Sequence, residues 1–299
     1  MATFEDIIEE VLLNLEGYSG SQAIFGTLNA NIGATDITLT VAGPTYGDGS
    51  GFSAGLVEVG EELINGLNFD PSTGIFTSCL RGWRGTTGVA HLAGELLRSN
   101  PKFPRVAVKK EINNTIQNVF PKVASVKSYE FTFNGAVARY DIPSNVREVL
   151  QVATWVPGAS KSWVPNNRFR FDFTGGSQSA TGKSIEVWDG VPGRLTRIVY
   201  QADPQPLVNL NDDFVVVSGL WDWAVPLIVY GACWRLSSFL DAGNAVTNSA
   251  AQKLINQTQA TSFGGQTISK YFYSLYQQAL TDAQTRVQNM YPAYIHRNY

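Results

Sequence analysis

The feature closest to a phosphate-binding loop is the Gly182–Lys183 pair, because such loops hold phosphate oxygens with backbone N–H groups and a lysine. A Walker A loop has a glycine where this chain has Ser177, and Gly176 stands one residue too early. The loop must also begin a helix, whereas Ser184–Trp188 has the pattern of a strand. The segment therefore predicts a flexible turn between strands, with Lys183 in solvent and no nucleotide site.

The chain contains few residues that could carry out acid–base or nucleophilic catalysis. His91 and His296 are its two histidines, and His91 has no Gly-x-Ser-x-Gly or cysteine nucleophile motif nearby. We therefore expect His91 to be structural and hydrogen-bonded. Neighbouring carboxylates occur at Glu9–Glu10, Glu61–Glu62 and Asp212–Asp213, but adjacent residues point in different directions on a helix or strand. A glycosidase-type pair drawn from distant segments stays open.

Cys79 and Cys233 each lie in an apolar stretch, which is typical of buried reduced thiols and not of a disulfide framework or a metal cage. We therefore expect no catalytic residue, no cofactor and no metal. The most apolar run, Leu220–Leu240, contains Asp222 and Arg235, so its uninterrupted part is shorter than the ~18 residues that span a membrane. The run predicts a buried helix and no membrane contact.

Aromatic and charged side chains alternate in Arg168–Phe173, a short distance after Trp163. Such a surface could stack on sugar rings or on single-stranded bases. Period-two alternation also predicts a strand in which Phe169, Phe171 and Phe173 face the core while the charged residues between them face solvent. We favour the core interpretation and keep a carbohydrate surface as a rival.

The apolar pattern predicts the order helix, small β module, helix, β sheet and three helices. Thr3 and Asp6 can form a capping box, followed by an apolar stripe that stops at Gly17. Short apolar runs separated by turn residues then predict strands, and a second helix covers about 106–121. The last three helices cover about 220–242, 244–260 and 266–290.

Helices from both ends of the chain would have to meet in order to bury their apolar stripes. We therefore predict an α+β fold in which a helical bundle is built from the N- and C-terminal helices. The predicted parts are the bundle at residues 1–26, 100–121 and 219–292, a small β module at 27–99, a larger antiparallel β-sheet domain at 122–218, and a C-terminal tail at 293–299.

Charged residues make up 16% of the 299 residues, and the net charge is −3, whereas roughly 25% charged residues is usual for a soluble domain. The balance excludes a nucleic-acid binder that works by bulk positive charge. The acidic N-terminus lacks the basic and apolar regions of a secretory signal, so we expect synthesis and use in the cytoplasm.

Generic patterning does not explain residues 79–97, where glycines and arginines surround a tryptophan. The segment has the outline Arg-Gly-x-x-Gly-Thr-x-x-x-x-His-x-x-Gly, carried by Arg81, Gly82, Gly85, Thr86, His91 and Gly94. Its glycines allow sharp turns, and Gly94–Leu97 returns as a strand. This segment resembles small β modules in neck and tail proteins of tailed bacteriophages.

The layout of the remaining chain resembles the long form of phage head-to-tail adaptor proteins. The resemblance implies a structural protein, not an enzyme, that forms a ring, commonly of twelve copies, below the portal of the capsid. Such a ring binds the portal and the tail or nozzle proteins, and DNA passes through its channel without sequence-specific binding during genome ejection. The implied location is the neck of the virion, after assembly in the host cytoplasm.

The resemblance also gives the tail a role as a peptide that docks on the portal. The docking residues would be Tyr294, Ile295, His296, Arg297 and Tyr299. Many weak tails on one ring would bind with high avidity, whereas the alternative is a frayed terminus. Two rivals to the adaptor stay open: another neck or tail protein, such as a tail completion or baseplate subunit, and a carbohydrate-binding or carbohydrate-degrading virion protein. The low charge content predicts that much of the surface is interface.

Overall fold

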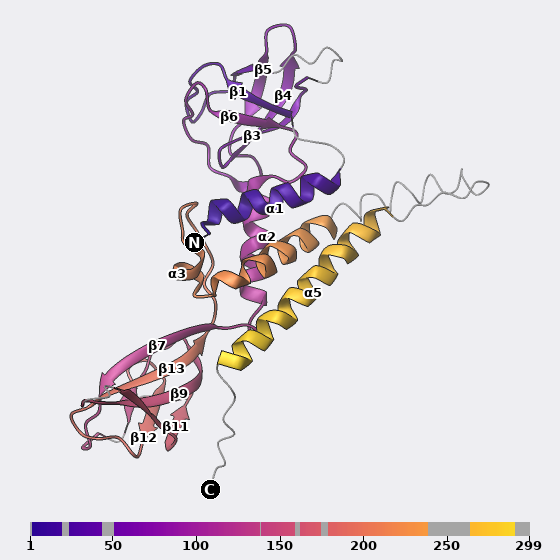
Figure 1. Cartoon of the computed structure of the whole chain (residues 1–299). Coiled ribbons are helices and arrows are strands. Elements are labelled where there is room, and N and C mark those ends of the chain that lie inside the picture. The colour runs from indigo at the N-terminus through magenta and orange to yellow at the C-terminus, as the bar shows by residue number, and fades with distance from the viewer. Residues whose placement is uncertain are drawn as a thin grey trace. The chain divides into compact units, whose positions relative to one another are not determined.

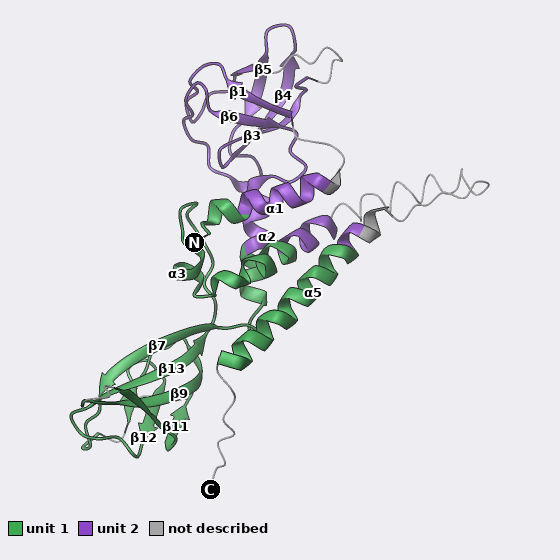
Figure 2. Cartoon of the chain, viewed as in Figure 1, with its two compact units in different colours: residues 1–7, 113–231, 270–299 green, residues 8–112, 232–269 purple. Residues whose placement is uncertain are grey.

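The computed structural model describes residues 2–19, 24–43, 51–137, 139–158, 162–174, 179–238 and 264–290. Helices and strands are mixed, and six strands close into a barrel, so the α+β part of the predicted fold is confirmed (Figure 1). The chain divides into two compact units, each described by itself (Figure 2). One unit contains residues 8–112 and 232–269, and the other contains residues 1–7, 113–231 and 270–299.

Helix α1 (Phe4–Ser19) begins with the predicted capping box. Asp6 Oδ2 accepts the backbone N–H of Thr3 at 2.8 Å, and the Asp6 N–H donates to Thr3 Oγ1 at 3.2 Å. These bonds satisfy N–H groups at the helix start, and the bonds that Thr3 donates to the Asp6 carboxylate lower its pKa. The predicted apolar stripe is buried, with exposed fractions of at most 3% for Phe4, Ile7, Ile8, Val11, Leu12 and Leu15.

The barrel lies in the unit of residues 8–112 and 232–269. Its strands are β1 (Ile24–Leu28), β2 (Leu39–Ala42), β3 (Gly55–Val59), β4 (Glu62–Asp70), β5 (Ile75–Leu80) and β6 (Leu96–Ser99). They pair antiparallel in the order β1-β2-β5-β4-β3-β6, and β6 closes on β1 with Leu97 opposite Gly26. Leu39, Ile64 and Phe76 are among the buried side chains that fill the core. The sequence predicted the β structure and the returning strand near Leu97, but not the closure.

Three helical segments meet at Gly231 in the other unit. They are the end of α2 (Arg105–Asn118), a helix over residues 225–238, and α5 (Gly264–Met290). A Cβ atom on Gly231 would overlap Thr115 Cγ2 and lie 3.1 Å from Tyr276 Cδ2, so glycine permits this close approach. The predicted helix at about 244–260 lies outside the described residues, and the complete bundle stays a prediction.

The segment that precedes the helix over 225–238 is tied to the start of α1. The Phe4 N–H donates to the Asp212 carbonyl at 2.9 Å, and the Phe214 N–H donates to the Ala2 carbonyl at 3.0 Å. Asp213 caps the short helix α3 (Phe214–Ser218), which ends before a 3₁₀ turn, η3 (Asp222–Ala224). The neighbouring carboxylates at 212 and 213 accept the N–H groups of Val208 at 2.8 Å and Val215 at 2.9 Å, respectively, so both have structural roles.

Two antiparallel sheets pack together in the region predicted as the larger β domain. The first has the order β10-β9-β13-β7 and the second β11-β12-β8. The strands are β7 (Ser125–Thr132), β8 (Tyr140–Asp141), β9 (Val146–Val156), β10 (Ser162–Asn166), β11 (Phe169–Asp172), β12 (Ser184–Val187) and β13 (Leu195–Ala202). Phe169 and Phe171 pack against the shared core, as predicted. Phe173 does not, because β11 ends at Asp172, and this side chain is 57% exposed.

The glycine–lysine segment is a turn before β12, as predicted, with Gly182 in the left-handed region at φ 77°. The prediction of a solvated Lys183 was wrong, because its Nζ donates to the Val146 carbonyl and the side chain is partly buried. Burial also lowers the pKa of Lys183. The lysine thus fastens a turn to β9 and is not displayed for phosphate.

Both cysteines are free and buried, as predicted. The described part of the chain contains no helix that is long and apolar enough to span a membrane. It also contains no group of three or more histidine, cysteine or acidic side chains arranged to hold a metal ion, within the residues given above.

Candidate functional site: a buried ion network under the barrel loop

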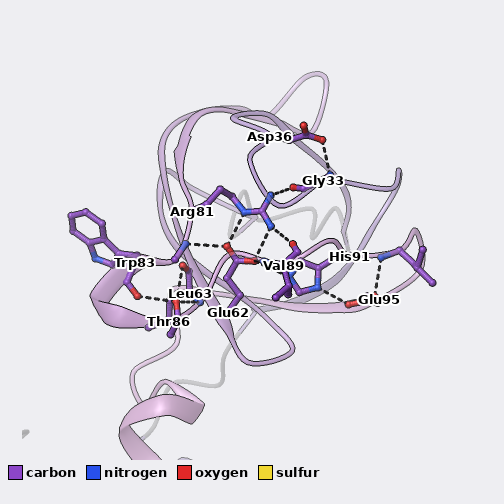
Figure 3. A network of polar contacts seen from close by, with 12 residues as sticks. Gly33, Asp36, Glu62, Leu63, Arg81, Trp83, Thr86, Val89, His91 and Glu95 are labelled. Atoms are coloured by element: carbon purple, nitrogen blue, oxygen red, sulfur yellow. Dashed lines mark hydrogen bonds and ion pairs between the residues drawn. The ribbon is translucent and has the colours of Figure 1, made fainter.

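The barrel motif is organised by a residue outside it, Glu62, at the start of β4 (Figure 3). Glu62 is 1% exposed and receives the guanidinium of Arg81, which directly follows β5. Arg81 Nε donates to Glu62 Oε1 at 2.8 Å, and Nη2 donates to Oε2 at 2.7 Å. This two-pronged pair fixes the direction in which the chain leaves β5.

The backbone of the following loop is bonded to the same pair. The N–H groups of Gly82 and Val89 donate to Glu62 at 3.0 and 3.1 Å. Arg81 in turn donates to the carbonyl of Val89 at 2.5 Å and to that of Gly33. The ion pair therefore supplies hydrogen bonds to the loop backbone in addition to its backbone bridge between His91 and Ile32.

His91 lies between two carboxylates and is 5% exposed. Its Nε2 is 2.9 Å from Glu62 Oε2, and its Nδ1 is 2.8 Å from Glu95 Oε2. Both ring nitrogens thus lie within hydrogen-bond distance of a carboxylate oxygen. The prediction of a hydrogen-bonded histidine is confirmed.

The remaining motif residues shape the backbone around this network. Gly82, Gly85 and Gly94 have φ values of 61°, 85° and 88°, which side-chain-bearing residues rarely adopt. Thr86 Oγ1 donates to the Trp83 carbonyl at 2.9 Å and accepts the Leu63 N–H at 3.1 Å. The structure thus places the six motif residues in one loop, with Arg81 and His91 joined through Glu62.

Hydrogen bonding outweighs burial in setting the charge of Glu62. Burial alone would raise its pKa, but bonds from Arg81, Val89, Gly82 and His91 lower it to about 2. The pKa of Glu95 is also lowered, chiefly by the Leu92 N–H and then by His91. The network pairs its charges internally, so its chemical role is to hold the loop in place.

A second buried carboxylate, Glu58, lies on β3 and is 2% exposed. It accepts the N–H of Arg105, at the start of α2, at 2.5 Å and Arg98 Nη1 at 3.3 Å. Arg98 also donates to Glu16 on α1 at 2.6 Å. Burial raises the pKa of Glu58 to about 7, because these few bonds do not offset its desolvation. This cluster joins the barrel to the helices of its own unit.

Sequence reasoning missed Glu62 and Glu58 because it considered acidic residues as adjacent pairs. Glu61 and Glu62 are neighbours, yet Glu61 is exposed and pairs with Lys109, while Glu62 is buried. Alternation gives no clear signal for either residue, because Glu62, Leu63 and Ile64 are all buried on β4, and Glu58 lies in a buried run on β3. The predicted docking residues Tyr294, Ile295, His296, Arg297 and Tyr299 lie outside the described residues.

Comparison with known proteins addresses a different part of the chain. A family model for SU10 adaptor proteins matches residues 104–296, which is well over half of the chain. No curated protein matches it. The matched range contains α2, the two sheets and α5 but not the barrel motif, so the two observations are independent. The chain therefore belongs to the SU10 adaptor protein family, which confirms its resemblance to phage head-to-tail adaptors.

Proposed function

We propose that this protein is a structural component of the virion that joins the capsid portal to the tail. In this proposal it assembles as a ring, commonly of twelve copies, in the virion neck after assembly in the host cytoplasm, and DNA passes through the ring without sequence-specific binding. The observation that carries the proposal is family membership over residues 104–296. The ring, its channel and its partners follow from the family resemblance.

Exposed apolar side chains support a role that requires many neighbours. The single chain leaves large apolar residues in solvent, including Leu13 at 74%, Val208 at 67% and Val216 at 75% exposure. Scattered exposed residues are common, but these occur together with an unusually low charge content. Both features are expected of a subunit whose surface is largely covered in an assembly.

The roles of the acidic residues support the proposal that the chain is not an enzyme. Glu9 pairs with Arg105, Glu61 with Lys109, and Glu62 with Arg81. Each of these three carboxylates is therefore engaged in an ion pair that connects elements of the fold. A glycan-release assay directly tests the rival hypothesis of a carbohydrate-degrading enzyme. Turnover that is abolished when one carboxylate is neutralised would establish that activity.

Electron microscopy of the purified protein, alone and mixed with portal rings, tests the adaptor proposal. Rings that cap the portal are the expected result. A stable monomer that does not bind the portal would contradict it, and rings that bind a tail structure but not the portal would favour a tail completion or baseplate subunit.

A deletion variant tests the docking role of residues 293–299 separately. Deleting these residues should leave the fold intact, measured by circular dichroism, and weaken portal attachment through the loss of many simultaneous contacts. Unchanged attachment would show that the tail is a frayed terminus.

A further inference from the structure

The loop above the ion network presents Trp83 and Arg84 on the surface of the barrel, in the short 3₁₀ turn η1 (Trp83–Gly85). Trp83 is 36% exposed and points away from the network (Figure 3). Arg84 is exposed and has a φ of 54°, a left-handed conformation that is strained for an arginine. Strain of this kind persists where the surrounding structure imposes it, and it often marks a functional position.

The ion network supplies the constraint that holds this turn. Glu62 accepts the N–H of Gly82 immediately before the turn, and Thr86 bonds to the Trp83 carbonyl immediately after it. Both ends of the turn are thus fixed to the barrel by hydrogen bonds from partly buried residues. Trp83 and Arg84, hereafter the Trp83–Arg84 knob, are presented with little backbone freedom to lose on binding.

Arg84 is also the unpaired base of the barrel. Residues 24–99 contain three arginines and no lysine. Arg81 and Arg98 pair with the buried carboxylates Glu62 and Glu58, whereas Arg84 has no side-chain partner among the described residues. Tryptophan and arginine are the side chains that most often dominate binding energy at protein interfaces.

The outer face of α1 has the complementary chemistry. Every charged residue of α1 is acidic. Leu13 is 74% exposed, and Glu10, one turn before it on the same face, is exposed and has no side-chain partner among the described residues. An aliphatic side chain beside an unpaired carboxylate offers an indole ring an apolar surface and a guanidinium a counter-charge.

We propose that the Trp83–Arg84 knob of one copy docks on the Glu10–Leu13 face of α1 in a neighbouring copy of this chain. The two surfaces are different, so the contact is heterologous, and its repetition closes into a ring when the rotation between copies allows it. This inference rests on the proposed ring and names one of its subunit contacts. The contact brings together two exposed apolar side chains and two unpaired opposite charges.

Charge reversal in the full chain tests the contact, with the mass distribution of assemblies at fixed protein concentration as the readout. Arg84→Glu places like charges together and should raise the concentration needed for assembly by on the order of 10- to 100-fold. Glu10→Arg should have the same effect. Combining the two substitutions should restore assembly, because the pair of opposite charges is present again with its order reversed.

Lys110→Glu is the matched control, because it reverses an exposed base on α2 outside the knob and should leave assembly unchanged. Circular dichroism establishes that each variant is folded. Assembly that is unchanged by either single reversal, or not restored in the folded double variant, overturns the contact. If Arg84→Glu still forms rings but no longer binds the portal or DNA, the proposed subunit contact is overturned, and the knob binds that partner instead.

The result also separates this contact from the adaptor role. Arg84→Glu rings that still cap the portal refute the contact and leave the adaptor role standing. A wild-type chain that stays monomeric refutes the contact, and its failure to bind the portal would refute the adaptor role as well.

Discussion

Replacing Glu62 by glutamine tests whether the ion network holds the barrel loop. Two carboxylate oxygens accept five contacts in the native barrel, from Arg81 twice, Gly82, Val89 and His91. In Glu62→Gln, one oxygen becomes an amide nitrogen that faces donors, and the Arg81 guanidinium loses its buried counter-charge. Breaking a buried charge pair from one side typically costs about 3–5 kcal/mol.

The pKa of Glu62 gives an independent route to the same magnitude. A carboxyl whose pKa falls from 4.5 to about 2 on folding stabilises the folded state by about 3 kcal/mol at neutral pH. Because the folded pKa is the lower one, this stabilisation is complete above pH 4.5 and is lost as the pH falls from 4.5 towards about 2. Glu62→Gln should lack that acid-dependent loss.

Hydrogen exchange followed by mass spectrometry on the full chain measures the effect within the barrel. Amides of β4, β5 and β6 should exchange roughly 100- to 4,000-fold faster in Glu62→Gln, since each ~1.4 kcal/mol is a factor of ten. Glu61→Gln is the matched control, because that exposed side chain pairs with Lys109 at the surface and its loss should cost less than about 1 kcal/mol. Equal, small effects for the two variants would refute the role assigned to Glu62.

Two further predictions concern burial and packing. The pKa of Glu58 is raised to about 7, so the folded state loses stability as the pH rises from 4.5 through about 7, by up to about 3 kcal/mol. The difference in urea midpoint between the wild type and Glu58→Gln should therefore change between pH 5 and 8. A difference that stays constant over this range contradicts the assignment. Gly231→Ala should destabilise the fold by about 1–3 kcal/mol in urea unfolding, because the new methyl group meets Thr115 and Tyr276. The control, Gly17→Ala, has open space around it and should not destabilise α1, so equal losses for the two glycines would argue against the close helix approach.

Local features of the fold followed from the sequence because their causes are local. The capping box of Thr3 and Asp6 and the apolar stripe of α1 depend on residues within a few positions of each other. Closure of the barrel depends on β1 pairing with β6, a contact between distant segments that no periodicity records. The prediction that Phe173 faces the core was wrong for a related reason, since alternation predicts the face of a residue but not where its strand ends.

In the candidate site, too, local features could be predicted from the sequence, whereas contacts between distant segments could not. The glycines of residues 79–97 indicated turns, and three of the four, Gly82, Gly85 and Gly94, have left-handed φ values. The partner of Arg81 could not be found from spacing, because Glu62 reaches it through the pairing of β4 with β5. Lys183 shows the converse error, since a lysine in a glycine-containing turn gives no local sign that it will bond to the carbonyl of Val146.

Glu58 and Glu62 lie close in sequence and are almost equally buried, yet their pKa values move in opposite directions. The difference follows from hydrogen bonding, since Glu62 accepts five contacts and Glu58 accepts two of which one, from Arg98, is as long as 3.3 Å. Five donors outweigh the cost of desolvation and two do not. The loop that carries Trp83 and Arg84 is thus fixed by a carboxylate that stays ionised at neutral pH, whereas the contact between the barrel and α2 contains one that titrates near neutral pH.

We therefore expect the Trp83–Arg84 knob to keep its geometry between pH 5 and 8, while the contact between the barrel and α2 changes. Hydrogen exchange in η1 and at the start of α2 over that pH range measures the difference. Exchange in η1 that changes with pH as much as exchange at the start of α2 would refute this division of roles.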